Sequence, residues 1–232
     1  MPIMKLGLSY QYLSRKKMNI LLPGLRKFSE KIFPKQQSLF ETLSEGQKPH
    51  SLMITCSDSR IDPNLVTQTN PGEIFVVRNA GNIIPPFGKS LGGEAATIEL
   101  AIEALGVSNI IICGHSQCGA MSALHNPKSL DKLPTLKSWL KFAGETQKFF
   151  ERKKEAYTIE NLAEKNVLVQ ADNLKTHPSV INALKEGRVH IFAWVYHFET
   201  GSITIYDPEK KAYVRTADVK DQIEENSSKF AL

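Results

Sequence analysis

Residues 109–119 read Asn-Ile-Ile-Ile-Cys-Gly-His-Ser-Gln-Cys-Gly, an apolar run that ends in polar and metal-binding side chains. Two earlier runs are similar, Ser51-Leu-Met-Ile-Thr-Cys56 and Glu73-Ile-Phe-Val-Val77, and the first of them continues into Ser-Asp-Ser-Arg60. Unbroken apolar runs rich in β-branched residues are typical of strands in a parallel sheet that is buried on both faces. We therefore expect neighbouring strands at 51–56, 73–77 and 109–113.

A helix is expected between the second and third runs. Its apolar residues recur at steps of four and three, and Gly106 ends the pattern; they are Leu91, Ala95, Ile98, Ile102 and Leu105. Strand, helix and strand in this order form one supersecondary unit. Further elements are predicted in the second half of the chain, namely helices at 135–154, 158–175 and 179–186, a strand at 189–198, and a strand at 203–206 after a turn at Gly201.

These elements predict an α/β fold class. The domain has a central, mostly parallel β-sheet flanked by helices, a C-terminal antiparallel hairpin and an N-terminal helical arm. Residues 1–45 form the extension and arm, in which apolar residues recur at helical spacing until Pro34 interrupts them. Met18 opens this amphipathic part and is a candidate for the natural start, which would leave residues 1–17 as an extension. Residues 46–232 form the α/β domain.

The net charge of +5 over 232 residues suggests an acidic partner, but its distribution does not. Residues 1–40 hold eight Lys or Arg against one acid, which leaves 21 Lys or Arg against 23 acids in residues 41–232. The main body is therefore nearly neutral, and neither a nucleic acid nor a membrane is expected as a partner.

Location is predicted from what the sequence contains. The longest uncharged run, 104–127, is too polar to span a membrane, and residues 1–40 lack the pattern of a secretory signal. Three cysteines do not form a disulfide framework, which favours a reducing compartment. We expect a cytoplasmic protein; the alternative is an organelle transit peptide in the acid-poor N-terminus.

Thiol and imidazole groups follow two of the buried strands. Cys56 ends the first strand, and His115 and Cys118 follow the third. Because the carboxyl ends of parallel strands meet at one sheet edge, these residues are expected to lie together. His115 and Cys118 would share one face if Ser116 and Gln117 began a helical turn. Two thiolates and one imidazole are typical zinc ligands, and three protein ligands leave the open position of a catalytic zinc site.

A backbone that stays extended after Cys56 would also point Asp58 and Arg60 into the same cleft. At this point the sequence resembles the β-class carbonic anhydrases, on Cys56-Ser-Asp-Ser-Arg60 and His115-x-x-Cys118. The flanking segments 71–82, 112–121 and 174–180 also resemble the family, as does Trp194-Val-Tyr, and the resemblance runs from about residue 18 to 207. It is most similar to the bacterial branch that includes the carbonic anhydrase accompanying cyanase.

The resemblance implies reversible hydration of CO2 to bicarbonate and a proton by a zinc-bound hydroxide. It implies one Zn²⁺ per chain, held by Cys56, His115 and Cys118. It also implies that Arg60 orients Asp58, which positions the nucleophile, and that Asp58 is a possible fourth ligand in a closed state.

The resemblance further assigns substrate contacts to Gln47, Phe75 and Gly119. The first two are expected to act across the interface of a homodimer, with a tetramer as the alternative assembly. Two positions depart from family patterns. Met53 stands where bicarbonate-inhibited members carry Trp, which predicts an open zinc site near neutral pH. Leu100 stands where plant members carry Tyr, which argues against a tyrosine proton-transfer role.

Other functions remain as alternatives. The same site could hydrolyse COS or CS2, and the pocket lining would decide. A catalytically silent zinc protein would need neither Asp58 nor Arg60. A thiol redox protein is disfavoured because the chain has no Cys-x-x-Cys. Cys113, inside an apolar run, is best explained as a small core residue. His125 could shuttle protons or simply lie on the surface.

Overall fold

The computed structural model describes residues 20–90 and 92–232, and it divides into two compact units, Met1–Gln47 and Lys48–Leu232. In the first unit, residues 20–27 are helical and continue into further helical segments, which are η1 (Phe28–Ile32), η2 (Phe33–Gln36) and α2 (Gln37–Ser44). The predicted helical arm with an interruption at Pro34 is confirmed, since η2 is a tight 3₁₀ turn with Pro34 near its start. The predicted extension 1–17 and Met18 lie outside the described residues.

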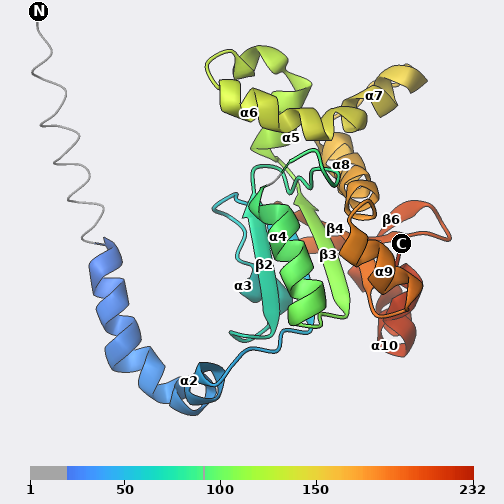
Figure 1. Ribbon diagram of the computed structural model, residues 1–232. Helices are drawn as coiled ribbons and strands as arrows, with labels where there is room; N and C mark the ends of the chain where they lie inside the picture. Colours follow the sequence, from blue (N-terminus) through green and yellow to red (C-terminus); the bar gives the residue numbers. More distant parts are fainter. Residues whose placement is uncertain (1–19, 91) are drawn as a thin grey trace, which may run out of the picture. The chain divides into compact units, whose positions relative to one another are not determined.

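The second unit is built on a six-stranded sheet in the order β2-β1-β3-β4-β5-β6 (Figure 1). The first four of these strands pair in parallel and the last two antiparallel. The strands are β1 (Ser51–Cys56), β2 (Ile74–Asn79), β3 (Asn109–His115), β4 (His190–His197), β5 (Ser202–Asp207) and β6 (Ala212–Arg215). The α/β fold class is therefore confirmed, with an antiparallel C-terminal part of two strands.

Side chains alternate between the two faces of the sheet, as the strand period of two requires. On one face Ile54, Ile112 and Val195 belong to a core cluster that includes helical residues such as Ile98 and Val167. This face is covered by α4 (Gly93–Glu99) with its continuation η3 (Leu100–Ala104), by α8 (Ile159–Leu174) and by α9 (Pro178–Lys185) (Figure 1).

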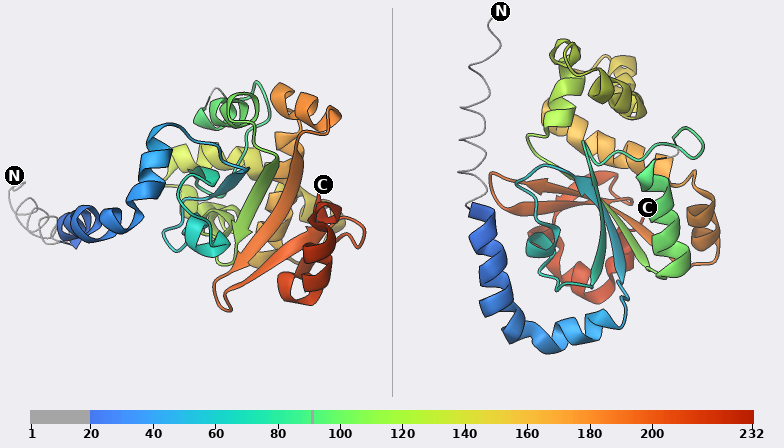
Figure 2. Two further views of the ribbon diagram at one scale, coloured as in Figure 1. Left: turned by 90° about the horizontal axis from the view of Figure 1, so that it is seen from below. Right: turned by 60° about the vertical axis from the view of Figure 1, so that its left-hand side comes forward.

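The opposite face of the sheet packs against the C-terminal segment. Met53 and Ile111 share a second core cluster with Val219 and Phe230. These last two lie in η6 (Thr216–Val219) and η7 (Ser227–Phe230), which flank α10 (Lys220–Asn226). Figure 2 shows the C-terminal helical segment on the side of the sheet away from α4 and α9.

A third cluster lies beyond the carboxyl ends of the strands. Cys56 and Cys118 pack there with Met121 and Leu162. The helical segments that contribute to this cluster besides α8 are α5 (Gly119–His125), η4 (Pro127–Leu130), α6 (Pro134–Trp139), η5 (Leu140–Ala143) and α7 (Gly144–Lys153). The short helix α3 (Pro63–Thr67) follows the turn after β1. Within the described part of the chain, no helix has both the length and the apolar content needed to cross a membrane.

Most predicted elements agree with the structure to within two residues, and the differences have local causes. The predicted helix at 135–154 is divided into α6, η5 and α7. The helix predicted from Leu91 is seen from Gly93, and Leu91 itself lies outside the described residues. Two expectations for the strand ends are wrong. Residues 58–61 form a turn closed by a hydrogen bond from the Ile61 N–H to the Asp58 carbonyl, so the backbone does not stay extended to Arg60. Gln117 takes a left-handed conformation (φ 52°), so no helical turn begins at Ser116.

Candidate metal centre

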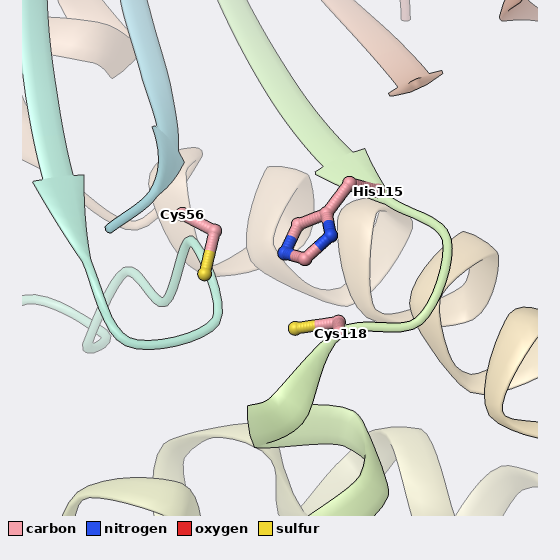
Figure 3. A group of neighbouring side chains, drawn as sticks. All are labelled: Cys56, His115 and Cys118. Atoms are coloured by element: carbon pink, nitrogen blue, oxygen red, sulfur yellow. The ribbon is translucent and has the colours of Figure 1, made fainter. Parts of the chain in front are cut away.

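Three buried side chains converge beyond the ends of β1 and β3. Each offers one donor atom, and the donor atoms of Cys56, His115 and Cys118 all lie within 4.8 Å of one another. Figure 3 shows Cys56 at the end of β1, His115 at the end of β3, and Cys118 just before α5, with their side chains turned toward a common point. All three residues are at most 6% exposed, so the group is shielded from bulk water.

The histidine is oriented for ligation by its second ring nitrogen. His115 Nδ1 lies 2.8 Å from the carbonyl oxygen of Ser116, an acceptor that fixes the proton on Nδ1. His115 Nε2 is buried and has no hydrogen-bond partner among the described residues. A buried ring nitrogen without a partner is costly unless it binds something. Its lone pair is therefore free for a metal ion, and the carbonyl contact is typical of metal-binding histidines.

The thiols of Cys56 and Cys118 are in contact and shift each other's pKa in opposite directions. A hydrogen bond from Cys118 lowers the pKa of the Cys56 thiol, and the N–H of Gly81, 3.4 Å from Cys56 Sγ, lowers it further. The pKa of the Cys118 thiol is raised, because Cys118 is in contact with Cys56 and is buried. A buried thiolate next to a thiol and an imidazole lone pair is a donor set that fits Zn²⁺, because bound zinc holds both sulfurs deprotonated.

A carboxylate and a guanidinium lie at the solvent side of this group. Arg60 Nη2 donates to Asp58 Oδ2 over 2.8 Å, and Arg60 Nε donates to Asp58 Oδ1 over 2.9 Å. The backbone N–H of Arg60 also donates to Oδ1, over 3.0 Å. The side-chain hydrogen bonds from Arg60 hold the pKa of the Asp58 carboxyl far below its usual value. The carboxylate is thus ionised and fixed in a two-point pair.

The turns that follow the strands bring these groups together. Arg78 on β2 donates to the carbonyl oxygens of Cys56 (3.1 Å) and Asp58 (2.7 Å), which holds the turn that carries the acid. Cys118 is the extended residue before α5, and Gly119 is the first residue of that helix. A methyl group built on Gly119 would meet no atom within 4 Å, so space is open at this position.

Phe75 and Gln47 are the two residues expected to act across a dimer interface, which a single chain does not test. Phe75 pairs with Leu52 in the sheet, four residues before Cys56, which corresponds to roughly 13 Å along the strand. Within its own chain, its partly buried side chain packs against the core on the α4 face. Gln47 ends the first unit of the chain. His125 is exposed at the end of α5, with its ring against Tyr157.

Several residues around Arg60 were not predicted as site residues. The ring of Phe198 lies under the guanidinium, 4.3 Å from Arg60 Cζ, and Gln117 accepts hydrogen bonds from Arg60. Glu199 accepts hydrogen bonds from both Ser116 Oγ and Gln117 Nε2. Phe198 and Glu199 come directly after β4, so the rule that side chains at parallel strand ends meet could have identified them.

The fold and site together define an α/β metalloprotein with a Cys₂His centre beside an acid–guanidinium pair. The sequence profile of the carbonic anhydrase family matches residues 51–203. Carbonic anhydrase from Synechococcus elongatus is 46% identical over 191 residues, which are 80% of this chain and 70% of the relative.

Solved structures agree with this assignment. The structure of the β-carbonic anhydrase CcaA superposes with a TM-score of 0.84 at 43% identity, covering 86% of this chain and 92% of that one. A tetrameric β-carbonic anhydrase from Sordaria macrospora gives a TM-score of 0.66 at 25% identity, covering 84% of this chain and 96% of that one. The chain belongs to the β-class carbonic anhydrases. It is a carbonate dehydratase whose site is built by Cys56, His115 and Cys118.

Proposed function

We propose that this carbonic anhydrase positions the water that attacks CO2 through Asp58, which Arg60 orients. The observation that carries the proposal is the two-point contact between these side chains beside the three metal-binding groups. Cys56, His115 and Cys118 would hold one Zn²⁺ per chain. Bound zinc supplies Lewis-acid activation, so that water becomes a nucleophile near neutral pH.

The hydrogen bonds of Asp58 leave one place for the attacking water. Oδ1 accepts from both the backbone N–H and Nε of Arg60, whereas Oδ2 accepts only from Nη2. A carboxylate oxygen has two lone pairs, so Oδ2 retains one acceptor position. Because Arg60 keeps the carboxyl ionised, Asp58 can only accept a hydrogen bond from the water. The oxygen lone pair of that water is then directed at the CO2 carbon.

Arg60 has a second role in this proposal, which is to keep Asp58 away from the metal ligands. Without the guanidinium, the carboxylate would be free to become a fourth ligand in a closed state. Met53, which is fully buried in the sheet face opposite α4, stands where bicarbonate-inhibited members of the family carry Trp. Because this Trp is absent, we propose that the zinc site stays open near neutral pH. Activity that collapses below about pH 8, together with Asp58 bound to zinc in a crystal structure, would contradict this.

We propose that the substrate pocket is completed by a second chain. Phe75 lies far along β2 from the metal ligands of its own chain, and Gln47 and Phe75 would act in the site of the partner. Gly119 would offer its backbone N–H to the substrate. The exposed apolar residues of the arm 1–45, such as Leu21 and Leu25, suit burial in a homodimer. The alternative assembly is a tetramer, as in the β-carbonic anhydrases of Sordaria macrospora.

The remaining assignments extend this proposal. Residues 46–232 would form the zinc-binding catalytic domain and residues 1–45 its arm. The protein would act in the cytoplasm, where buried free thiols remain reduced. The cyanase-associated branch is proposed on the motif resemblance alone.

The proposed function is tested by measuring the zinc content of the purified protein and then its rate of CO2 hydration by stopped flow. We expect one zinc per wild-type chain, loss of zinc and activity in Cys56→Ser, and a loss of at least about 100-fold in kcat/KM in Asp58→Ala with zinc retained. Lys128→Ala, on η4, is the control and should match wild type. An Asp58→Ala enzyme with full activity would overturn the proposed role of Asp58, and activity without zinc would overturn the mechanism.

A further inference from the structure

The turn between β4 and β5 places a carboxylate beside the loop that follows β3. Glu199 Oε2 accepts a hydrogen bond from Ser116 Oγ over 2.8 Å, and Glu199 Oε1 accepts one from Gln117 Nε2 over 2.6 Å. The same hydroxyl of Ser116 accepts from the backbone N–H of Phe198 over 2.9 Å. Two loops that are more than 80 residues apart in the sequence are therefore joined by side chains.

Gln117 passes this contact on to Arg60. Its Oε1 accepts from Arg60 Nη1 over 3.3 Å, and its backbone carbonyl accepts from Arg60 Nη2 over 3.2 Å. An amide has one donating and one accepting end. Because Glu199 is a carboxylate and only accepts, it selects the orientation in which the nitrogen of Gln117 faces Glu199 and the oxygen faces Arg60. The other orientation would place the amide nitrogen against the guanidinium.

Arg60 needs such support because its side chain is 46% exposed. An exposed ion pair contributes little by itself, since water competes for both partners and the side chains lose entropy on pairing. The guanidinium is instead held from three sides, by Asp58, by Gln117 and by the Phe198 ring 4.3 Å beneath it. Two of these three contacts involve Glu199 or its neighbour in the same turn.

We propose that Glu199 and Gln117 are positioning residues that hold Arg60 in the geometry in which it orients Asp58. The inference rests on the proposed role of Asp58 and Arg60. It extends that role to Gln117, which occupies an unspecified position of the His115-x-x-Cys118 motif, and to Glu199, which lies outside both motifs. Glu199 does not touch substrate in this proposal; it fixes the amide of Gln117, and Gln117 fixes the guanidinium.

The proposal is tested by exchanging the side chains of Gln117 and Glu199, first one at a time and then together. Gln117→Glu alone sets two carboxylates against each other. Glu199→Gln alone can still accept from Gln117 only by turning its amide nitrogen toward Ser116 Oγ, and the Ser116 hydroxyl then loses the acceptor for its own proton. We expect each single variant to lower kcat/KM for CO2 hydration about five- to tenfold. In the double variant a carboxylate at 117 accepts from Arg60 and an amide at 199 donates to it, so kcat/KM should return to within about twofold of wild type.

A second measurement follows Arg60 itself. The Nε–H of Arg60 donates to Asp58, and its NMR signal can be assigned because it is absent from the spectrum of Arg60→Lys. We expect this Nε–H proton to exchange with water faster than in wild type in both single variants, and as slowly as in wild type in the double variant. Glu145→Gln removes a surface carboxylate that holds Lys148 and Arg152 on α7, and it should change neither reading. Zinc content is measured for every variant.

Wild-type kcat/KM with an unchanged Arg60 signal in the single variants would overturn the proposal. A double variant as poor as the product of the two singles would also overturn it, since the residues would then act separately. Asp58→Asn is measured in parallel. If Asp58→Asn kept wild-type activity, the proposed function would fail, whereas the positioning of Arg60 would still be decided by the exchange of its Nε–H.

Discussion

Asn166 on α8 donates its side-chain N–H to the carbonyl oxygen of Gly81 over 2.9 Å, and the N–H of Gly81 lies against Cys56 Sγ. The oxygen of Asn166 accepts from Gln170 Nε2 (2.9 Å) and from Thr146 Oγ1 (3.3 Å). Asn166, Gln170 and Thr146 are almost completely buried. A polar network inside the core therefore fixes the loop that presents a backbone donor to a metal ligand.

Replacing Asn166 with Ala is expected to lower the free energy of unfolding by about 2–3 kcal/mol, because the groups of Gly81, Gln170 and Thr146 then lie buried without their partner. The variant should also bind zinc more weakly, since the loop beside Cys56 is less fixed. Urea unfolding and a chelator competition assay measure the two effects. Asp172→Ala, on the exposed side of the same helix, is the control and should cost less than about 0.5 kcal/mol. Equal losses in the two variants would contradict the role of the network.

Much of this fold could be predicted because apolar patterns are local signals. The run at 51–56 is buried at every position, and the helix of Ile98 and Ile102 faces the core as its spacing indicates. β6 and α10 were not predicted. The sequences Ala212-Tyr-Val-Arg215 and Lys220–Asn226 are short and mostly polar, and their structure depends on packing against β5 and the sheet face.

The metal ligands could be predicted for a related reason. Parallel strands end at one edge, so Cys56 and His115 had to be close once β1 and β3 were neighbours. The turn before Cys118 could not be predicted, because a left-handed conformation at Gln117 is rare for a residue with a side chain. The contact between Glu199 and Gln117 could not be predicted either, because it joins two loops that are far apart in the sequence and no local pattern indicates that they meet.

Gly114 is a second position where close packing supports the site. A methyl group built on Gly114 would lie 2.7 Å from Val167 Cγ2, and Gly114 directly precedes His115 in β3. We expect Gly114→Ala to destabilise the protein by about 1–3 kcal/mol, because α8 must move away from the sheet. The double variant with Val167→Ala should recover part of this loss, as a thermal unfolding cycle would show. Gly144→Ala on α7, where nothing lies within 4 Å, is the control. Additive losses would argue against the predicted clash.

Metal removal should affect folding as well as activity. A ligand that binds only the folded state stabilises it by about 2.7 kcal/mol at 100 times its dissociation constant. Treatment with a zinc chelator should therefore lower the melting temperature by several degrees and abolish CO2 hydration, and added zinc should restore both. In Cys118→Ser the chelator should change the melting temperature much less. A wild-type melting temperature that does not respond to chelation would contradict a metal held by Cys56, His115 and Cys118.

Glu164 on α8 gives a pH-dependent prediction away from the metal centre. Burial, and secondarily the nearby charge of Glu160, raise the pKa of the Glu164 carboxyl. The folded state thus binds this proton more tightly than the unfolded state, so the stabilisation is present at low pH and is lost as pH rises through the folded-state pKa.

Glu164→Gln should therefore be more stable than wild type at pH 7, by about 0.3–0.5 kcal/mol because the group is partly exposed and screened. The difference should shrink with falling pH and vanish below the unfolded-state pKa of about 4.3. Urea unfolding of both proteins between pH 4 and pH 7 measures it. Glu99→Gln, at an exposed position on α4, is the control and should show no gain that grows with pH. A Glu164→Gln protein that is less stable than wild type at pH 7 would show that the carboxylate is stabilised by its surroundings, and that burial does not dominate at this position.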